Sequence, residues 1–459
     1  MSGLFGTLSI ALSSLNVSQD EMAITANNVA NVNTAGYSRQ VADVAAGAPI
    51  TIGGHTFGTG VVLQKIESLR DPLLEIQLNL ETQNQSKLTT ELTQLQRAQT
   101  QFGSETAGIG ADITNFFSSV QQLSPDPSSL PLRQGVLGAA NTLATDFNNA
   151  AISLQVQRSS VDQTAVLSVS QVNSLTAQIA TVNQQISKLQ GANQDTGALV
   201  DHQTTLIRSL SQLVDVQVVP TDNGISVTTS NGTALVSGSL SFALSTKLGS
   251  GGVQHIMAGS QDITASLTSG SLAGLIQIRD TEIPSLQSKL DQLASGFANA
   301  LNTANAQGYD LNGNKGGNIF VPPAVGGVGA AAALTVSMTD SALIAASSDG
   351  TPGSNGNLAV ISAVANQVVA NGQTPLSAYS SIVFQVGSDT ANTSAEADSS
   401  LLILQQLQNQ RGSISGVSLD EEAANLVKFQ TAYQAASRVV SVIDSLLSDA
   451  LNLGIGSAV

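Results

Sequence analysis

The sequence predicts a mainly α-helical protein, an elongated multi-helix rod that carries terminal coiled-coil helices and a small β subdomain. Apolar residues recur every seven positions at both ends of the 459-residue chain, which is typical of helices that pack along one stripe. The chain has 11 Phe, 4 Tyr and no Trp, so its core must be mostly aliphatic, which suits close-packed helices. Runs of β-branched residues between turn residues concentrate in one short region.

The first predicted element is an N-terminal helix that ends near positions 31–36. Asn-Val-Asn-Thr-Ala-Gly in this interval offers residues that tolerate a left-handed backbone and bond to their own main chain. The apolar stripe of this helix needs burial against another surface. Within the stripe, the residues that we expect at a subunit interface are Leu8, Leu12, Leu15, Met22 and Val29.

The interior of the chain is expected to be mostly helical. Apolar residues keep a helical phase over much of 73–214, and Pro125, Pro127 and Pro131 interrupt the run. Further helical segments are expected over 272–307 and 376–411, because the apolar periodicity returns there.

Strand patterns occupy the region between these helices. Short apolar or β-branched runs at 216–219, 225–229 and 234–236, with Ser-Asn-Gly at 230–232, indicate a hairpin. We therefore expect a small β unit over 216–268. The segment 308–356 is rich in Gly, Ala and Asn, and indicates loops with one strand at 334–337.

The last predicted element is a C-terminal helix over 419–450. At about 1.5 Å per residue it is about 45 Å long, which exceeds what a compact domain needs. Ser418 and Glu421 have the spacing of a capping box, and Asp420, Glu421 and Glu422 suit the positive end of the helix dipole. The residues of its stripe that we expect at a subunit interface are Leu419, Leu426, Phe429, Tyr433, Val440, Ile443 and Leu447.

These elements predict three regions. The terminal coiled-coil core comprises 1–66 and 414–459, the helical rod domain comprises 67–215 and 269–413, and the small β subdomain comprises 216–268. From periodicity alone, ordinary core helices and helices that pack on neighbouring subunits are about equally supported. The outer positions are mostly uncharged Ser, Thr, Asn and Gln, whereas freely solvated long helices carry interleaved Lys and Glu. This composition favours packing of the terminal helices against other protein.

Composition also argues against several function classes. A formal net charge of −16 disfavours binding to nucleic acid or to anionic membranes. The chain has no cysteine, and its three histidines, His55, His202 and His255, lack the spacing of metal ligands. The run 310–314 has the opening spacing of a calcium loop, but Lys315 and Val321 stand where glycine and glutamate are needed. We expect no enzyme activity, no cofactor and no metal site.

The sequence gives no indication of membrane insertion. No stretch approaches 18 uninterrupted apolar residues, which is the length that a spanning helix requires. Residues 1–33 contain no basic side chain ahead of an apolar run. We therefore expect no membrane insertion and no cleaved signal peptide.

Three separated segments resemble one family of proteins. Residues 26–39, Ala-Asn-Asn-Val-Ala-Asn-Val-Asn-Thr-Ala-Gly-Tyr-Ser-Arg, resemble the N-terminal signature of the flagellar rod, hook and hook-associated axial proteins. Residues 413–422, with 425–430 and Tyr433, are similar to the C-terminal signature of the hook-associated protein 1 family, and 269–276 are similar to an internal segment of it. The signature residues are Asn27, Asn28, Asn31, Asn33, Gly36, Tyr37, Arg39, Gly416, Asp420 and Glu421.

The resemblance implies a structural adaptor at the bacterial flagellar hook–filament junction, which polymerises through paired terminal helices. The implied partners are other copies of the chain in a ring or helical layer, the hook protein, a second hook-associated junction protein and an export chaperone on the C-terminal helix. The resemblance also implies type III export to an extracellular position in the flagellum. Longer members carry an outer β domain between positions matching Phe320 and Ser341. We expect this domain to be absent here, because only the short, Gly/Ala-rich segment 321–340 occupies the interval.

Three alternatives are compatible with the sequence: a hook or distal-rod subunit of the same superfamily, a secreted hydrolase with an export helix, and a generic coiled-coil scaffold. A β-dominated middle would favour the first, and a pocket with clustered acids or histidine would favour the second. We also expect the terminal helices to be disordered or loosely helical before assembly. In that hypothesis, packing between subunits alone buries Leu8, Leu15, Leu426, Tyr433 and Val440.

Overall fold

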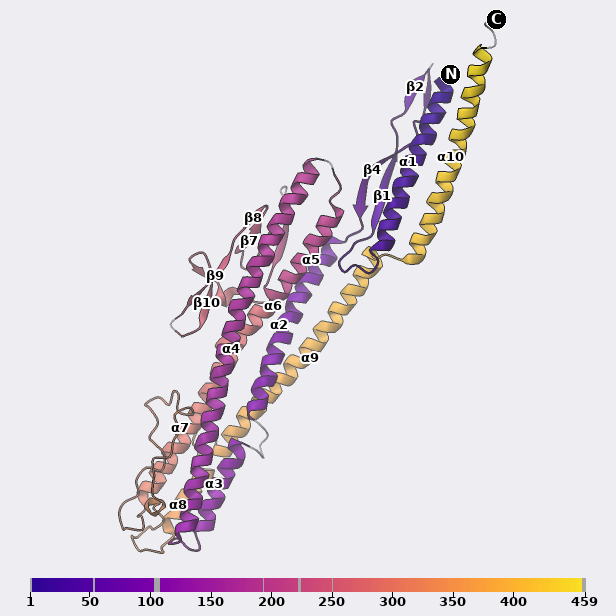
Figure 1. Cartoon of the computed structure of the whole chain (residues 1–459). Coiled ribbons are helices and arrows are strands. Elements are labelled where there is room, and N and C mark those ends of the chain that lie inside the picture. The colour runs from indigo at the N-terminus through magenta and orange to yellow at the C-terminus, as the bar shows by residue number, and fades with distance from the viewer. Residues whose placement is uncertain are drawn as a thin grey trace. The chain divides into compact units, whose positions relative to one another are not determined.

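A computed structural model describes residues 2–52, 54–102, 108–192, 194–221, 224–249 and 251–455. These residues form a mainly α-helical chain with small antiparallel sheets, which confirms the predicted fold class (Figure 1). The chain divides into two compact units. The first combines Met1–Thr82, Val172–Ala243 and Leu402–Val459, and the second combines Gln83–Gln171 and Leu244–Leu401. Helices α2 (Pro72–Phe102), α4 (Leu130–Gly191) and α9 (Pro375–Ser415) contribute residues to both units.

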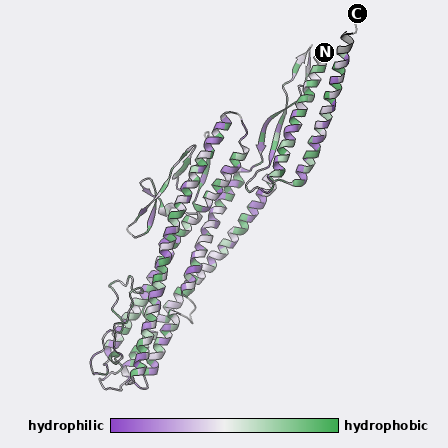
Figure 2. Cartoon of the chain, in the orientation of Figure 1, coloured by the Kyte–Doolittle hydropathy of each residue, from purple (hydrophilic) through white to green (hydrophobic). Residues whose placement is uncertain are grey.

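The first unit contains the two terminal helices. Helices α1 (Ser2–Ala30) and α10 (Leu419–Ile455) run antiparallel and pack side by side (Figure 1). Helix α1 ends where the Asn- and Gly-containing segment begins, as the sequence predicted. Hydrophobic and hydrophilic residues alternate along both helices (Figure 2), because a seven-residue apolar repeat places its members on one stripe. None of the helices in the described part of the chain is long and apolar enough to cross a bilayer.

A β-hairpin follows α1, and the sequence analysis missed it. Strand β1 (Gln40–Ala46) pairs antiparallel with β4 (Val61–Ser68), and β2 (Ile50–Ile52) pairs with β3 (His55–Phe57) nearer the tip. The predicted coiled-coil region 1–66 is therefore only partly helical. The strands gave no clear alternation because the register shifts between Asp43 and Val44 and because one face lies against α1.

The strands predicted over 216–268 form two sheets instead of one subdomain. Strands β5 (Gln217–Thr221), β6 (Gly224–Thr228), β7 (Ala234–Ser237) and β8 (Leu240–Ser241) form a four-stranded antiparallel sheet in the first unit, after α5 (Gly197–Leu213). Strands β9 (Leu244–Leu248), β10 (Gln254–Ala258) and β11 (Gln261–Asp262) form a separate sheet in the second unit. Strand periodicity identified individual strands, but which strands pair is decided by long-range packing.

The second unit is a helical bundle with an aromatic centre. Its helices include α3 (Ile109–Leu123), α6 (Gly270–Gln277), α7 (Ile283–Gln307) and α8 (Gly356–Ala363). Phe297 lies edge-on to Phe116 and Phe117, with ring centroids 5.9 and 6.0 Å away, and also contacts Phe320. A π-helical turn over Ile278–Glu282 joins α6 to α7, so the predicted helix over 272–307 is continuous but irregular. Short 3-10 turns occupy Thr264–Ser266, Ser341–Leu343 and Val364–Asn366.

The segment between α7 and α8 consists of loops tied down by side chains. The strand predicted at 334–337 is reduced to an isolated bridge between Phe320 and Val336. Asp310 accepts hydrogen bonds from the backbone N–H groups of Asn312 and Asn314, both at 2.8 Å, so its carboxylate closes a polar turn. These local bonds replace a regular ladder, which a Gly- and Ala-rich segment does not sustain.

Candidate assembly site at the terminal helices

The link between α1 and β1 contains most of the N-terminal signature. Asn31 donates from its side chain to the Asn27 carbonyl at 3.0 Å, which satisfies an end of α1. Gly36 has a φ of +84°, and a Cβ at this position would lie 2.5 Å from Oγ1 of Thr205 on α5. Both the left-handed backbone and the close approach of α5 therefore require glycine here.

Asn28 is buried and uses both ends of its amide. Its Oδ1 accepts from the hydroxyl of Tyr37 at 2.8 Å and from the backbone N–H of Gln40 at 2.9 Å. Its Nδ2 donates to the Gln40 carbonyl at 2.9 Å and to the Glu422 carboxylate at 3.3 Å. Asn28 thus joins the end of α1, the start of β1 and the start of α10.

The environment of Tyr37 keeps its phenol protonated. Burial raises the pKa of Tyr37 to about 12, and the negative charges of Asp201, Glu422 and Asp195 act in the same direction. The hydroxyl therefore remains a hydrogen-bond donor to Asn28 over the physiological pH range.

Arg39 bonds to the first turn of α10. Its Nε donates to Glu422 at 2.6 Å and one of its terminal nitrogens donates to Glu421 at 2.8 Å. Its backbone N–H donates to the carbonyl of Ser415, the last residue of α9, at 2.9 Å. Glu422 is 1% exposed, so this pair is largely removed from water. We call Asn28, Tyr37, Arg39, Glu421 and Glu422 the junction cluster.

The junction cluster corrects the interpretation of the acids that begin α10. The N–H of Glu421 points at the Ser418 hydroxyl at 3.5 Å, but the Glu421 carboxylate is bonded to Arg39 instead of closing a capping box. Glu422 likewise accepts hydrogen bonds from Arg39 and Asn28, so the helix dipole alone does not explain why acidic residues begin α10. A partner nearly 400 positions away competes successfully with a local bond because it brings a full opposite charge.

Further ion pairs surround the junction cluster within the first unit, and sequence reasoning missed them. Arg70 bonds to Asp201 at 2.8 Å and to the Gly197 carbonyl at 2.7 Å. Glu75 accepts from Arg411 at 2.6 Å and from Arg208 at 2.7 Å. Arg411 also donates to the carbonyl of Gly36 at 3.0 Å. No local pattern marked these residues, because their partners lie on different elements.

The structure gathers most signature residues and separates a few. Asn27 donates to the Gln40 side chain at 3.0 Å and so lies beside the junction cluster. The N–H of Gly416 bonds to the Gly412 carbonyl at 3.0 Å, in the turn between α9 and α10. Asn33 and Asp420 are exposed.

The predicted interface residues differ in exposure. On α10, Leu419, Leu426 and Tyr433 remain 53%, 43% and 37% exposed, and we call these three the outer row. Leu12 and Val29 of α1 are also exposed. The half-buried or buried members are Leu8, Leu15, Met22, Phe429, Val440, Ile443 and Leu447.

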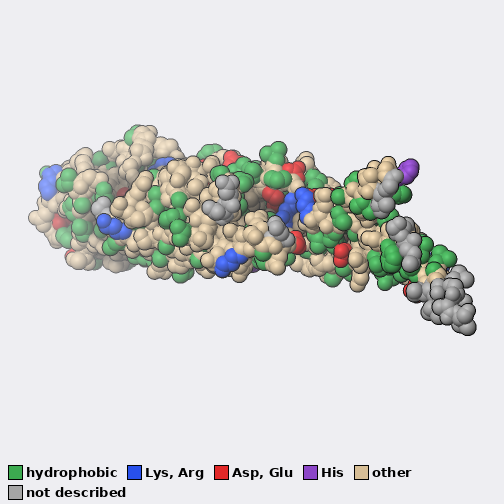
Figure 3. Space-filling view, turned by 90° about the horizontal axis from the view of Figure 1, so that it is seen from above, with side chains coloured by type: hydrophobic (Ala, Val, Ile, Leu, Met, Phe, Trp, Pro, Cys, Tyr) green, Lys and Arg blue, Asp and Glu red, His purple; other side chains and the backbone are tan. Residues whose placement is uncertain are grey.

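Contacts within one chain therefore already cover part of the apolar stripes. This corrects the expectation that packing between subunits alone buries Leu8, Leu15 and Val440, whose partly covered positions arise because α1 and α10 pack on each other. The outer row, by contrast, stays open together with Val427, Val439, Val442 and Leu446. On the face shown in Figure 3, charged side chains are few and scattered between hydrophobic and uncharged polar groups.

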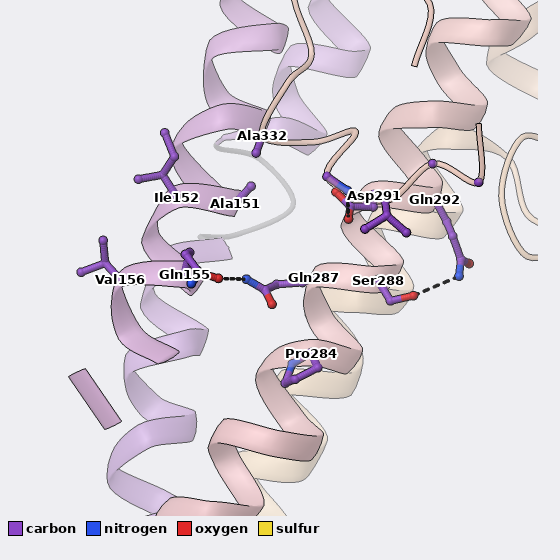
Figure 4. Close-up of a pocket in the computed structure, with 14 residues that line it drawn as sticks. Ala151, Ile152, Gln155, Val156, Pro284, Gln287, Ser288, Asp291, Gln292 and Ala332 are labelled. Atoms are coloured by element: carbon purple, nitrogen blue, oxygen red, sulfur yellow. Dashed lines mark hydrogen bonds between the residues drawn. The ribbon is translucent and has the colours of Figure 1, made fainter. Parts of the chain in front are cut away.

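One open hollow in the second unit provides no acid–base pair. It has a volume of about 520 Å³ and lies between α4, α7 and the 326–332 loop (Figure 4). Its walls include Ile152, Val156 and Pro284, and Gln287 donates to Gln155 across it at 3.3 Å. Asp291 is the acid among the lining residues, and its carboxylate accepts from two loop N–H groups at 2.7 and 2.9 Å.

A second hollow is lined by a histidine–carboxylate pair, His255 and Asp262, of the kind that acid–base catalysis uses. Nδ1 of His255 lies 2.5 Å from the Asp262 carboxylate, whose other oxygen accepts from Thr264. These hydrogen bonds, led by the one from His255, lower the pKa of Asp262 to about 2. The ring also lies against Gly249, where an added Cβ would be 2.3 Å from Nε2. Both groups therefore make contacts that hold the β9–β11 sheet together.

Three family models match three separate parts of the chain. The "Flagella basal body rod protein" model matches residues 8–37, and the "Flagellar basal body rod FlgEFG protein C-terminal" model matches 409–453. The chain is thus a bacterial flagellar axial protein, because models of such proteins match both of its terminal segments. The "Flagellar hook-associated protein FlgK helical domain" model matches 95–320. Within the class, the chain belongs to the flagellar hook-associated protein 1 family.

Relatives of this family align over nearly the whole chain. Flagellar hook-associated protein 1 of Escherichia coli is 27% identical, covering 96% of this chain and 98% of the relative. The Bacillus subtilis protein of the same name is 29% identical, covering 99% of this chain and 100% of the relative. The solved structure of the flagellar hook junction protein FlgK from Burkholderia pseudomallei has the same fold, with a TM-score of 0.68 at 20% identity, over 74% of this chain and 100% of that chain. The alignment with the E. coli relative extends over 540 positions, so that relative carries residues that this chain lacks.

Proposed function

We propose that the protein is a structural adaptor of the flagellar hook–filament junction that polymerises through its terminal helices. The observation that carries this proposal is the outer row of α10, which stays exposed beside a charged and hydrogen-bonded junction cluster. Membership of the hook-associated protein 1 family supports the position in the flagellum.

Energetics support assembly through the outer row. Burying a Leu or Val side chain completely contributes about 1.5–3 kcal/mol. Seven apolar side chains of α10 are roughly one-third to two-thirds exposed, so covering them contributes on the order of 5–10 kcal/mol per copy before ordering costs. Copies of the chain in a ring or helical layer would supply that cover.

The remaining partners follow from the same surface. The hook protein and a second junction protein would extend the stack of axial subunits on either side. An export chaperone would cover the C-terminal helix before assembly, because an exposed apolar helix otherwise associates unspecifically. Export through the flagellar channel would place the protein outside the cell. We propose no catalytic role and no cofactor.

Electron microscopy of a deletion strain tests this function. Cells that lack the protein should carry hooks without filaments and should release unattached flagellin into the medium, and a plasmid copy should restore filaments. Loss of the hooks themselves would instead indicate a hook or distal-rod subunit, which is the alternative within the same superfamily. Unaltered filaments would reject the proposal and return attention to a scaffold or a secreted hydrolase.

A further inference from the structure

Glu422 occupies a core position of the heptad pattern on α10. It belongs to the series Glu422, Phe429, Ala436 and Ile443, which recurs every seven residues and which we call the inner row. Glu422, Ala436 and Ile443 are buried and Phe429 is half-buried, whereas the outer row is exposed and becomes half-buried only where its heptad series continues at Val440 and Leu447. A carboxylate therefore takes a place that hydrophobic residues fill in the next three heptads.

Apolar burial alone does not explain why the inner row is the one covered. The outer row carries Leu419, Leu426 and Tyr433, which together offer more apolar surface than a row containing a glutamate and an alanine. The two rows are three positions apart, so turning α10 by about 60° would bring the outer row to the place that the inner row holds and carry the inner row farther round the helix. Maximal hydrophobic burial would favour the arrangement that the structure does not adopt.

The hydrogen bonds of Glu422 oppose that rotation. One carboxylate oxygen accepts from Nε of Arg39 at 2.6 Å, and the other accepts from Nδ2 of Asn28 at 3.3 Å. Asn28 is fixed by its bonds to Gln40, and Arg39 by its backbone bond to Ser415. Rotation of α10 would carry the carboxylate away from both donors and leave the buried Asn28 amide and the Arg39 guanidinium without this partner, which opposes the gain in apolar burial.

We infer that Glu422, held by Arg39 and Asn28, is a positioning residue that selects which apolar row of α10 packs against α1. A single polar residue in a heptad core sets helix register in coiled coils at some expense of stability, and Glu422 acts here on rotational phase by the same physics. The inference concerns packing within one chain and is independent of the proposed function.

Single cysteines test the phase, because the chain contains no cysteine of its own. Ala436→Cys reports the inner row and Tyr433→Cys reports the outer row, each in the full-length chain at low concentration. The measured quantity is the ratio of maleimide labelling rates at 433 and 436. We expect a ratio of at least tenfold in the otherwise native chain, and a ratio near one or inverted after Glu422→Leu.

A double variant separates phase from stability. Arg39→Met with Glu422→Leu removes both charges, so no unpaired charge remains buried and the chain can stay folded. We expect the double variant to retain helical circular dichroism and still lose the labelling ratio. Glu421→Gln is the matched control, since it alters the exposed partner of the same arginine and should keep the tenfold ratio.

Two results would overturn the inference. One is an unchanged tenfold ratio in the folded double variant, which would mean that the apolar residues choose the phase. The other is equal labelling at 433 and 436 in the otherwise native chain, which would mean that no phase is fixed.

Discussion

Nε of Arg39 donates a 2.6 Å hydrogen bond to the carboxylate of Glu422, although 383 positions of sequence separate the two residues. Arg39 precedes the β-hairpin that follows α1, and Glu422 lies in the first turn of α10. The pair therefore links the segment that follows α1 to the first turn of α10. Because Glu422 is buried, its charge depends on this partner for compensation.

Arg39→Lys should weaken this junction. A lysine ammonium is a single point charge, so it cannot replace a guanidinium that serves both Glu421 and Glu422. We expect the local opening free energy of the first turns of α10 to fall by about 1–3 kcal/mol, measured as faster amide hydrogen exchange there. Arg438→Lys, on an exposed position of the same helix, is the control. Equal exchange in the two variants would contradict the role of Arg39.

Gly36→Ala should destabilise the first unit. The substitution places a Cβ on a backbone with φ of +84° and 2.5 Å from Thr205. We expect the free energy of unfolding of the first unit to fall by about 1–3 kcal/mol, seen as a lower urea midpoint. Gly54→Ala is the matched control, because Gly54 has a φ of +83° but no atom near the added Cβ. If both variants lose the same stability, the contact with α5 contributes nothing.

Leu426→Asp should prevent assembly while leaving the second unit folded. The side chain belongs to the exposed outer row, so a charge there makes burial against another copy unfavourable. We expect no incorporation into the flagellum and unchanged thermal unfolding of the second unit. Ser437→Asp, at an exposed polar position of α10, should still assemble. Normal incorporation of the Leu426 variant would remove the outer row from the proposed interface.

Glu91→Gln should stabilise the second unit at neutral and alkaline pH but not near pH 4.5. Burial raises the pKa of Glu91 to about 7, the charges of Glu282 and Glu396 add to this shift, and Lys87 opposes it. A raised carboxyl pKa gives stability that is complete below about 4.5 and is lost as the pH rises through about 7. The free energy of unfolding of the glutamine variant should therefore exceed that of the native chain by about 1–2 kcal/mol at pH 8 and should equal it near pH 4.5.

Thermal melts at the two pH values measure this difference. Asp398→Asn, which changes an exposed carboxylate on α9, is the control and should shift neither melt. A gain of the Glu91 variant at both pH values would show that burial of a charge is not the cause.

Hydrogen exchange should distinguish the terminal helices from the bundle before assembly. Helices α1 and α10 pack mainly on each other and on one hairpin, whereas α7 buries residues such as Leu290 and Phe297 completely. We expect amides of α10 in the dilute chain to be protected by packing on α1, but to exchange at least a hundredfold faster than those of α7, and to exchange more slowly in the assembled form. Equal protection of α10 and α7 in the dilute chain would contradict a terminal helix pair that assembly stabilises further.

Local patterns were sufficient for the long helices and for part of the strands, but they did not identify α8. Heptad spacing identified α1 and α10, and turn residues identified the hairpin of β6 and β7, because both signals lie within a few neighbouring positions. The β1–β4 hairpin was not predicted, because its half-buried, Ala-containing strands pair with an irregular register and lack a clear alternation of apolar and polar residues.

By itself the sequence determined that this protein has two amphipathic terminal helices, a helical interior and a signature at each end. Tertiary structure alone decided that Arg39 bonds to Glu421 and Glu422, that Glu75 lies between Arg208 and Arg411, and that the outer row of α10 stays open. The physical reason is range: periodicity and capping act within one or two turns of helix. Ion pairs and the choice of a buried face depend on which distant segments the folded chain brings within a few ångströms.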